Sequence, residues 1–120
     1  MIDKDSINSA VKECHGISKN AGWWNDVDLN SPYVVATKLC LIHSEISEAM
    51  EGHRKDIMDD HLPDRKMVEV ELADAVIRIF DLAGALNLDV GGAMVDKLAY
   101  NQQREDHKLE ARFGNGGKSY

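Results

Sequence analysis

The sequence is poor in the residues that staple or interrupt a fold. Its 120 positions hold two prolines, two cysteines and 6% aromatic residues. Two cysteines without ligand spacing exclude a disulfide framework and a zinc site, and free thiols favour the cytosol. No apolar run approaches the roughly 18 residues that cross a bilayer. The start, Met1 to Asp5, is acidic and lacks a secretory hydrophobic stretch. We therefore expect a cytoplasmic protein without a membrane partner.

Positive charge is also in deficit. Fourteen lysines and arginines face 21 acidic residues, which gives a formal net charge of −7. This balance argues against a nucleic acid polymer as partner, because phosphate backbones are bound by basic surfaces. A small phosphorylated ligand stays compatible with the composition, since a bound metal ion reverses the sign of an acidic pocket locally.

The pattern of apolar residues is helical throughout and contains no internal repeat. Periodicity predicts four helices: roughly 5–20, a second from Pro32 that is broken by Gly52 and by residues 56–64, a third over roughly 64–86, and a fourth from the cap Asp89 to about Arg112. Residues 113–120 form a glycine-rich tail. We expect an all-α fold, a four-helix bundle-like array in a single domain over residues 1–120. A mixed fold with strands is the alternative.

The predicted third helix is apolar around roughly two-thirds of its circumference. Its single polar stripe contains Glu71, Asp74, Arg78 and Asp81. A helix of this kind is buried on several sides. In so short a chain, part of that burial would come from another copy, so we expect oligomerisation.

Two pairs of acidic residues lie at helical spacing. Glu45 and Glu48 share one face of the second helix, and Glu71 and Asp74 repeat the spacing on the third. Held together across a helix interface, four carboxylates need a compensating cation, and Mg²⁺ prefers such oxygen ligands. The alternative is that these are solvated faces of surface helices, and the spacing alone leaves the two interpretations about equal.

Several other centres are excluded by missing residues. No histidine follows a glutamate at the spacing of a ferritin-like di-iron site, and we expect His15, His53 and His61 at the surface. There is no Walker-type phosphate loop. Cys14 and Cys40 lie at predicted core positions of helices, so neither is expected to act as a nucleophile.

A basic ridge and a pair of tryptophans complete the candidates. Lys97, Asn101, Arg104 and Lys108 recur at spacings of three or four, and Lys118 follows in the tail. The ridge is either a solvated face or the partner of a triphosphate held at the acidic residues. Trp23 and Trp24 either fix their loop to the helices or stack on a nucleobase.

Together these motifs resemble the MazG family of all-α nucleoside triphosphate pyrophosphatases. The family's mark is a Glu-x-x-Glu on one helix and a Glu-x-x-Asp on the next, which here are Glu45–Glu48 and Glu71–Asp74. Small relatives continue with a lysine, an Asn-x-x-Arg and a Gly-Gly-Lys, and this chain has Lys97, Asn101 to Arg104, and Gly116 to Lys118. The resemblance covers about residues 22–118. The chain departs from the pattern by the insertion of residues 105–114 before the tail.

The resemblance implies a function and a distribution of roles. The reaction would be Mg²⁺-dependent hydrolysis of a nucleoside triphosphate to the monophosphate and pyrophosphate, with Mn²⁺ as a substitute metal, in cleansing of the nucleotide pool. Glu45, Glu48, Glu71 and Asp74 would bind the metal, and Glu48 would also act as general base. The substrate would be bound by Trp23, Trp24, Lys38, Lys97, Asn101, Arg104 and Lys118. Such enzymes form homodimers or homotetramers with sites near subunit contacts. The alternatives are a non-catalytic module that senses nucleotides or binds a partner, and a purely structural assembly protein.

Overall fold

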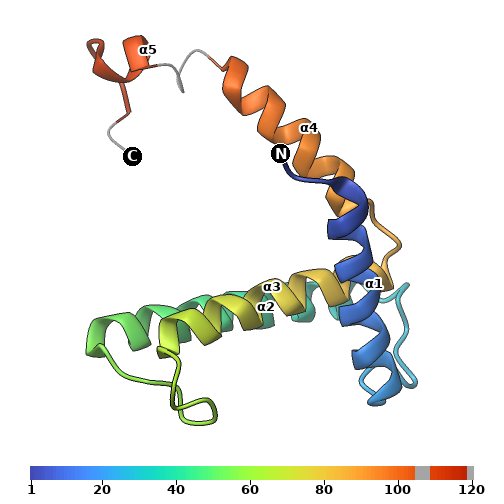
Figure 1. Ribbon diagram of the computed structural model, residues 1–120. Helices are drawn as coiled ribbons and strands as arrows, with labels where there is room; N and C mark the ends of the chain where they lie inside the picture. Colours follow the sequence, from blue (N-terminus) through green and yellow to red (C-terminus); the bar gives the residue numbers. More distant parts are fainter. Residues whose placement is uncertain (105–108, 119–120) are drawn as a thin grey trace. The chain divides into compact units, whose positions relative to one another are not determined.

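The computed structural model describes residues 1–104 and 109–118, and these residues are helical with short connections. Five helices occur in the described chain: α1 Lys4–Asn20, α2 Pro32–Lys55, α3 Met67–Ala85, α4 Val90–Gln103 and the short α5 Leu109–Phe113 (Figure 1). The described residues contain no strand, only an isolated bridge between Met58 and Lys66. The predicted all-α class is confirmed. None of the described helices has both the length and the apolar character to cross a membrane.

The chain divides into two compact units. We call Ser9–Leu88 the hairpin unit and the two segments Met1–Asn8 and Asp89–Tyr120 the terminal unit. Helix α1 begins in the terminal unit and ends in the hairpin unit. Each unit is considered by itself below, and the expectation of one bundle-like domain stays a prediction.

Helices α2 and α3 lie side by side and form the centre of the hairpin unit (Figure 1). Helix α2 begins where the sequence predicts, because the Ser31 hydroxyl accepts the Tyr33 amide at 3.3 Å and Pro32 occupies the first turn. The prediction that Gly52 breaks this helix was wrong. Gly52 lies inside α2, buried against Met67, and a Cβ there would come within 2.8 Å of the Met67 Cβ. The glycine allows close packing and does not end the helix.

The connection between α2 and α3 is organised by one buried acidic residue. Asp56 ends α2 in the left-handed conformation. Asp59, only 7% exposed, accepts the amides of His61 and Leu62 at 2.9 and 2.8 Å, and its own amide donates to the carbonyl of Arg65. Hydrogen bonds from two amides satisfy a buried carboxylate, so Asp59 has a structural role in the turn that makes α2 and α3 antiparallel.

Helix α1 crosses α3 near the end of α3. The Cβ of His15 occupies the space beside Gly84 that a side chain there would need. The buried apolar residues are few and mostly small: Val11, Ala49, Ala75, Leu82 and Ala83. No large side chain is fully buried within the described residues. The prediction that both cysteines lie in the core was wrong for Cys40, which is exposed, whereas Cys14 is half-buried.

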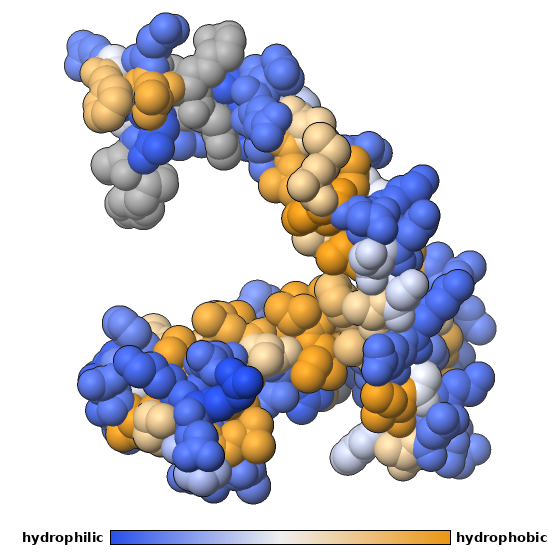
Figure 2. Space-filling view, in the orientation of Figure 1, coloured by the Kyte–Doolittle hydropathy of each residue, from blue (hydrophilic) through white to orange (hydrophobic). Residues whose placement is uncertain are grey.

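The apolar surface of α3 is covered on one side only. Ala75 and Leu82 are buried, whereas Leu72, Val76 and Ile79 are 48%, 46% and 39% exposed. The single chain therefore buries one side of α3, and the expectation that another copy covers the rest stays a prediction. Figure 2 shows hydrophobic side chains gathered along the α2–α3 pair on the face in view. Apolar surface of this extent normally contacts something other than water.

Helix α4 is fixed to the start of α1 within the terminal unit. The Asp89 carboxylate caps α4 by accepting the Gly92 amide at 2.8 Å, and it also accepts from the Asn8 side chain at 2.7 Å. The Asn8 side-chain oxygen Oδ1 in turn accepts the Gly91 amide. The predicted cap is thus confirmed, but the helix ends at Gln103 and does not continue to Arg112. Lys108, the last residue of the predicted basic ridge, lies outside the described residues.

Candidate metal centre

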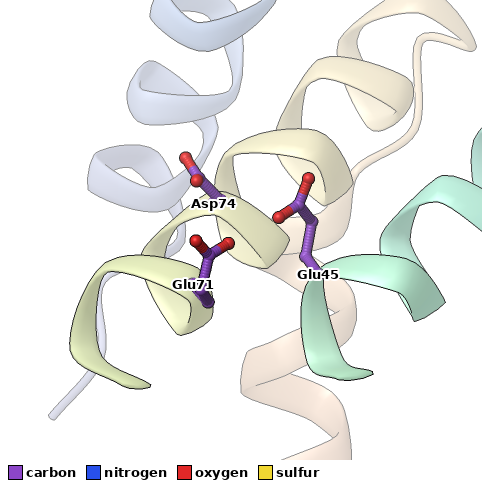
Figure 3. A group of neighbouring side chains, drawn as sticks. All are labelled: Glu45, Glu71 and Asp74. Carbon is purple, nitrogen blue, oxygen red and sulfur yellow. The ribbon is translucent and has the colours of Figure 1, made fainter. Parts of the chain in front are cut away.

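Three of the four predicted carboxylates converge between α2 and α3. Glu45 projects from α2, and Glu71 and Asp74 project from neighbouring turns of α3 toward it (Figure 3). One carboxylate oxygen from each residue lies within 4.8 Å of the other two. The antiparallel pairing of α2 and α3 brings together residues that are 26 positions apart, and the three-residue spacing of Glu71 and Asp74 puts both on one face of α3.

Burial distinguishes this cluster from a solvated acidic face. Glu45 and Glu71 are each 8% exposed. The Glu71 Oε2 atom is buried without any hydrogen-bond partner. An unpaired carboxylate oxygen removed from water is costly, so its charge requires a proton or a cation.

The three carboxyl groups respond to this crowding in different ways. Burial and the adjacent carboxylates of Glu45 and Glu48 raise the pKa of Glu71 to about 8. Burial and the charge of Glu45 also raise the pKa of Asp74. Burial acts in the same direction on Glu45, but hydrogen bonding to Glu71 and Arg78 outweighs it and lowers the pKa of Glu45 overall. The cluster thus favours a proton on Glu71 and a charge on Glu45.

Arg78 is the cation nearest to this cluster in the described chain. Its Nε donates to Glu45 Oε1 at 2.8 Å. The Arg78 side chain is 43% exposed and the Glu45 side chain 11%. Arg78 therefore offsets part of the negative charge from the solvent side, while the buried Glu71 Oε2 gains nothing from it.

Glu48 lies beside the cluster and not in it. Glu48 is exposed, and it is not one of the three residues whose oxygens converge. It lies close enough to Glu71 to contribute to the raised pKa of that residue. Of the four predicted ligands, the structure thus brings three together and places Glu48 at the solvent-facing edge.

An open pocket of about 610 Å³ adjoins the carboxylates within the hairpin unit. Glu45, Asp74 and Arg78 line it toward the cluster, and Trp23, Lys38 and Asp81 line it further along the helices. Two of the predicted substrate-binding residues, Trp23 and Lys38, therefore share a pocket with two of the predicted metal ligands.

The two tryptophans are not equivalent. Trp23 is 71% exposed and lines the pocket. Trp24 is half-buried, and its indole Nε1 donates to Asp81 Oδ1 at 2.8 Å. Lys38 Nζ lies 4.5 Å from the centre of the Trp24 ring, within the range of a cation–π contact. Trp24 fixes the loop to the helices, and Trp23 presents its ring to the pocket.

The remaining predicted substrate-binding residues belong to the terminal unit. Lys97 is exposed, with its Nζ 4.7 Å from the Tyr100 ring centre. Asn101 has a buried Oδ1 without a hydrogen-bond partner. Arg104 caps the end of α4, and Lys118 is exposed in the tail. These four residues and the carboxylate cluster therefore lie in different compact units.

Two residues that line the pocket, Arg78 and Asp81, and one that contacts Asp81, His15, were given no role by the sequence. Arg78 and Asp81 belong to the polar stripe of an otherwise apolar α3, and this contrast is the signal that marks them. His15 was predicted at the surface, and this was wrong: its side chain is 22% exposed and its Nδ1 lies 2.9 Å from Asp81 Oδ1. No spacing within α1 indicates this contact, because it depends on how α1 crosses α3.

No protein-family model, curated protein or solved structure matches this chain.

Proposed function

We propose that this protein is a Mg²⁺-dependent nucleoside triphosphate pyrophosphohydrolase of the MazG type. It would convert a nucleoside or deoxynucleoside triphosphate to the monophosphate and pyrophosphate, in the cytoplasm, as part of cleansing the nucleotide pool. The observation that carries the proposal is the convergence of Glu45, Glu71 and Asp74, of which Glu45 and Glu71 are buried and one Glu71 oxygen is unpartnered. A structural cluster would pair each carboxylate with a donor of the chain, and Glu71 Oε2 has none.

The residues present fit a hard divalent cation. All three convergent ligands are carboxylates, without sulfur or imidazole, and oxygen ligands favour Mg²⁺ or its substitute Mn²⁺ over zinc or copper. Glu45, Glu71 and Asp74 would hold the ion. Mg²⁺, when bound, neutralises charge on the phosphate chain and acidifies water near it.

Glu48 is proposed as the general base. It is exposed beside the cluster, so its carboxylate is accessible to water. In the proposed reaction, water cleaves the bond between the α- and β-phosphates, its proton passes to Glu48, and pyrophosphate leaves. A positioned base of this kind typically contributes about 10² to 10⁴ in rate.

Positive side chains along the pocket would bind the phosphates. Arg78 and Lys38 both line it. Without a metal ion, Arg78 neutralises the charge of Glu45. When a metal ion neutralises Glu45 instead, the half-exposed guanidinium of Arg78 is suited to bind a phosphate. Lys97, Asn101, Arg104 and Lys118 are proposed as further phosphate or sugar contacts from the terminal unit.

The proposed assembly is a homodimer or homotetramer. The exposed residues Leu72, Val76 and Ile79 recur at helical spacing on the side of α3 that is opposite to Glu71, Asp74 and Asp81. On α2, Leu39, Ile46 and Met50 are 47%, 47% and 58% exposed and also share one stripe. A second copy that covers these stripes would leave the carboxylates and the pocket accessible.

A substrate panel tests the proposed function. The protein is incubated with each common nucleoside and deoxynucleoside triphosphate and Mg²⁺, and monophosphate and pyrophosphate are quantified. We expect equimolar release of the two products from at least one substrate, and strongly reduced release by Glu48→Gln. Glu51→Gln, which removes an exposed carboxylate paired with Arg54 and Lys55 on the same helix, is the matched control.

Two results would contradict the proposal. Absence of turnover with every triphosphate would favour a non-catalytic nucleotide-binding module. Full turnover by Glu48→Gln would refute the role given to that residue. A Mg²⁺-dependent rise in melting temperature without turnover would retain the metal site alone, and no rise at all would favour a structural assembly protein.

A further inference from the structure

A half-buried carboxylate, Asp81, lies on the stripe of α3 that carries Glu71 and Asp74. Asp81 follows Asp74 by seven residues, which is two helical turns, so the two side chains share a face about 10 Å apart along the axis. Its side chain is 17% exposed and lines the same pocket. The proposed hydrolysis does not use this residue.

The two oxygens of Asp81 have different surroundings. Oδ1 accepts from Trp24 Nε1 at 2.8 Å and from His15 Nδ1 at 2.9 Å. These are the hydrogen bonds that the described residues make with this side chain, and both end on Oδ1. Because His15 and Trp24 both bond to Oδ1, the orientation of the Asp81 carboxylate is fixed. Oδ2 is the oxygen that remains for a ligand in the pocket.

Helix α2 repeats the same spacing. Lys38 precedes Glu45 by seven residues, and α2 runs antiparallel to α3. Glu45 and Asp74 therefore mark one end of the pocket, and Lys38 and Asp81 mark the other. Trp24 joins that second pair, since its ring lies under Lys38 and its N–H is bonded to Asp81.

The two ends of the pocket match the two ends of a nucleotide. If the carboxylate cluster binds the phosphates through a divalent cation, an extended nucleotide places its base about two helical turns away, near Asp81. Trp23, which is exposed on the pocket wall, supplies an aromatic face on which a base can stack. Stacking alone does not distinguish bases, so selectivity requires a polar group at the base edge.

We propose that Asp81 selects the base, with Oδ2 accepting a hydrogen bond from an exocyclic amino group. This inference rests on the proposed function, because it places the phosphates at the carboxylate cluster. A carboxylate accepts hydrogen bonds and has none to donate. An amino group of cytosine or adenine satisfies it, whereas a keto oxygen at the same position faces another acceptor. The site therefore prefers amino-bearing bases over their keto counterparts.

Matched substrate pairs test this preference without altering the protein. dCTP has an amino group where dUTP has an oxygen, and its neighbouring ring nitrogen is an acceptor where that of dUTP is an N–H donor. ATP and ITP differ in the same way. We expect kcat/KM to favour the amino member of at least one pair by about tenfold or more, because a site built to bind a polar group rejects the analogue that lacks it. Equal use of both members of both pairs would overturn the proposal. A preference for the keto members would also overturn it, and would favour Lys38 as the group that contacts the base.

Asp81→Asn separates selection from a structural contribution. The amide oxygen can still accept from His15 and Trp24, while the amide nitrogen would offer a donor to the pocket. We expect the amino-to-keto ratio to fall at least tenfold, toward the keto substrates, with thermal unfolding close to that of the parent protein. Asp60→Asn, in the exposed part of the connection between α2 and α3, is the control and should keep the parent ratio. An unchanged ratio in Asp81→Asn would contradict the assignment.

A binding measurement separates failure of this inference from failure of the proposed function. Quenching of tryptophan fluorescence by dCMP and by dUMP gives a ratio of Kd values that does not depend on hydrolysis. A ratio of about fivefold or more in favour of dCMP, without turnover of any triphosphate, would retain Asp81 as the selective group and refute only the hydrolase. Turnover together with a Kd ratio near one would refute only the inference.

Discussion

The carboxylate cluster and the basic residues of α4 carry opposite charges, and they are built in opposite ways. Glu45, Glu71 and Asp74 converge from two helices, and two of the three are largely buried. Lys97 and Asn101 lie on α4 in the other compact unit, and Arg104 follows the last residue of that helix. Packing fixes the position of each carboxylate, whereas the basic residues contribute mainly charge. We therefore expect single substitutions to be severe in the cluster and mild on the ridge.

The largest expected effect is that of Glu71→Gln. This change keeps the shape of the side chain but removes the ligand whose oxygen has no other partner. We expect kcat/KM for pyrophosphate release to fall by about 10³-fold, comparable with the loss of a central electrostatic group in other enzymes. Glu69→Gln, on the exposed side of the same helix, should change it less than about twofold. A loss below tenfold in Glu71→Gln would mean that the cluster is not the reaction centre.

The second effect is on how the folding stability of the metal-free protein depends on pH. The pKa of Glu71 is raised to about 8 in the folded protein from an ordinary value of 4.5. The folded state then binds more protons than the unfolded state between these values, so stability falls as pH rises from about 5 to above 8. The raised pKa of Asp74 acts in the same direction, and the lowered pKa of Glu45 matters only below about 4.5.

Urea unfolding in EDTA at pH 5, 6.5 and 8.5 measures this dependence. We expect the free energy of unfolding to fall by about 1–2 kcal/mol between pH 5 and 8.5, because Glu71 becomes an unpaired buried charge. Glu71→Gln should flatten the profile and be more stable than the parent protein at pH 8.5. A parent profile that is flat or rises with pH would contradict the repulsion inferred for the cluster.

The smallest effect is expected on the ridge. Lys97→Ala removes an exposed charge that contacts Tyr100, and we expect KM to rise about three- to tenfold with kcat nearly unchanged. The effect should shrink between low and physiological salt, because exposed charges are screened. Lys55→Ala, which removes another exposed lysine, is the control. A loss of kcat as large as that of Glu71→Gln would contradict the difference expected between the cluster and the ridge, and would make Lys97 part of the reaction centre.

The same contrast explains what could be predicted from the sequence. Helical periodicity, the Ser31–Pro32 start and the Asp89 cap are local signals, and the structure confirms them. The spacing also marked four carboxylates as candidates, and three of them meet. Tertiary contacts could not be predicted from local sequence. Gly52 was interpreted as a helix breaker, since the residue that packs against it, Met67, lies 15 positions away in the sequence. His15 seemed to be a surface residue because its partner Asp81 lies on another helix. The end of α4 at Gln103 was missed because no glycine or proline interrupts residues 104–112.

The central claim is that the carboxylate cluster binds a divalent cation, and calorimetric titration of the metal-free protein with Mg²⁺ tests it most directly. We predict binding that releases protons near pH 7, since the metal displaces the proton favoured on Glu71. Titration in two buffers of different ionisation enthalpy measures that release. Binding should be lost in Glu71→Gln and retained in Glu69→Gln. Absence of binding, or equal binding in Glu71→Gln, would contradict the account.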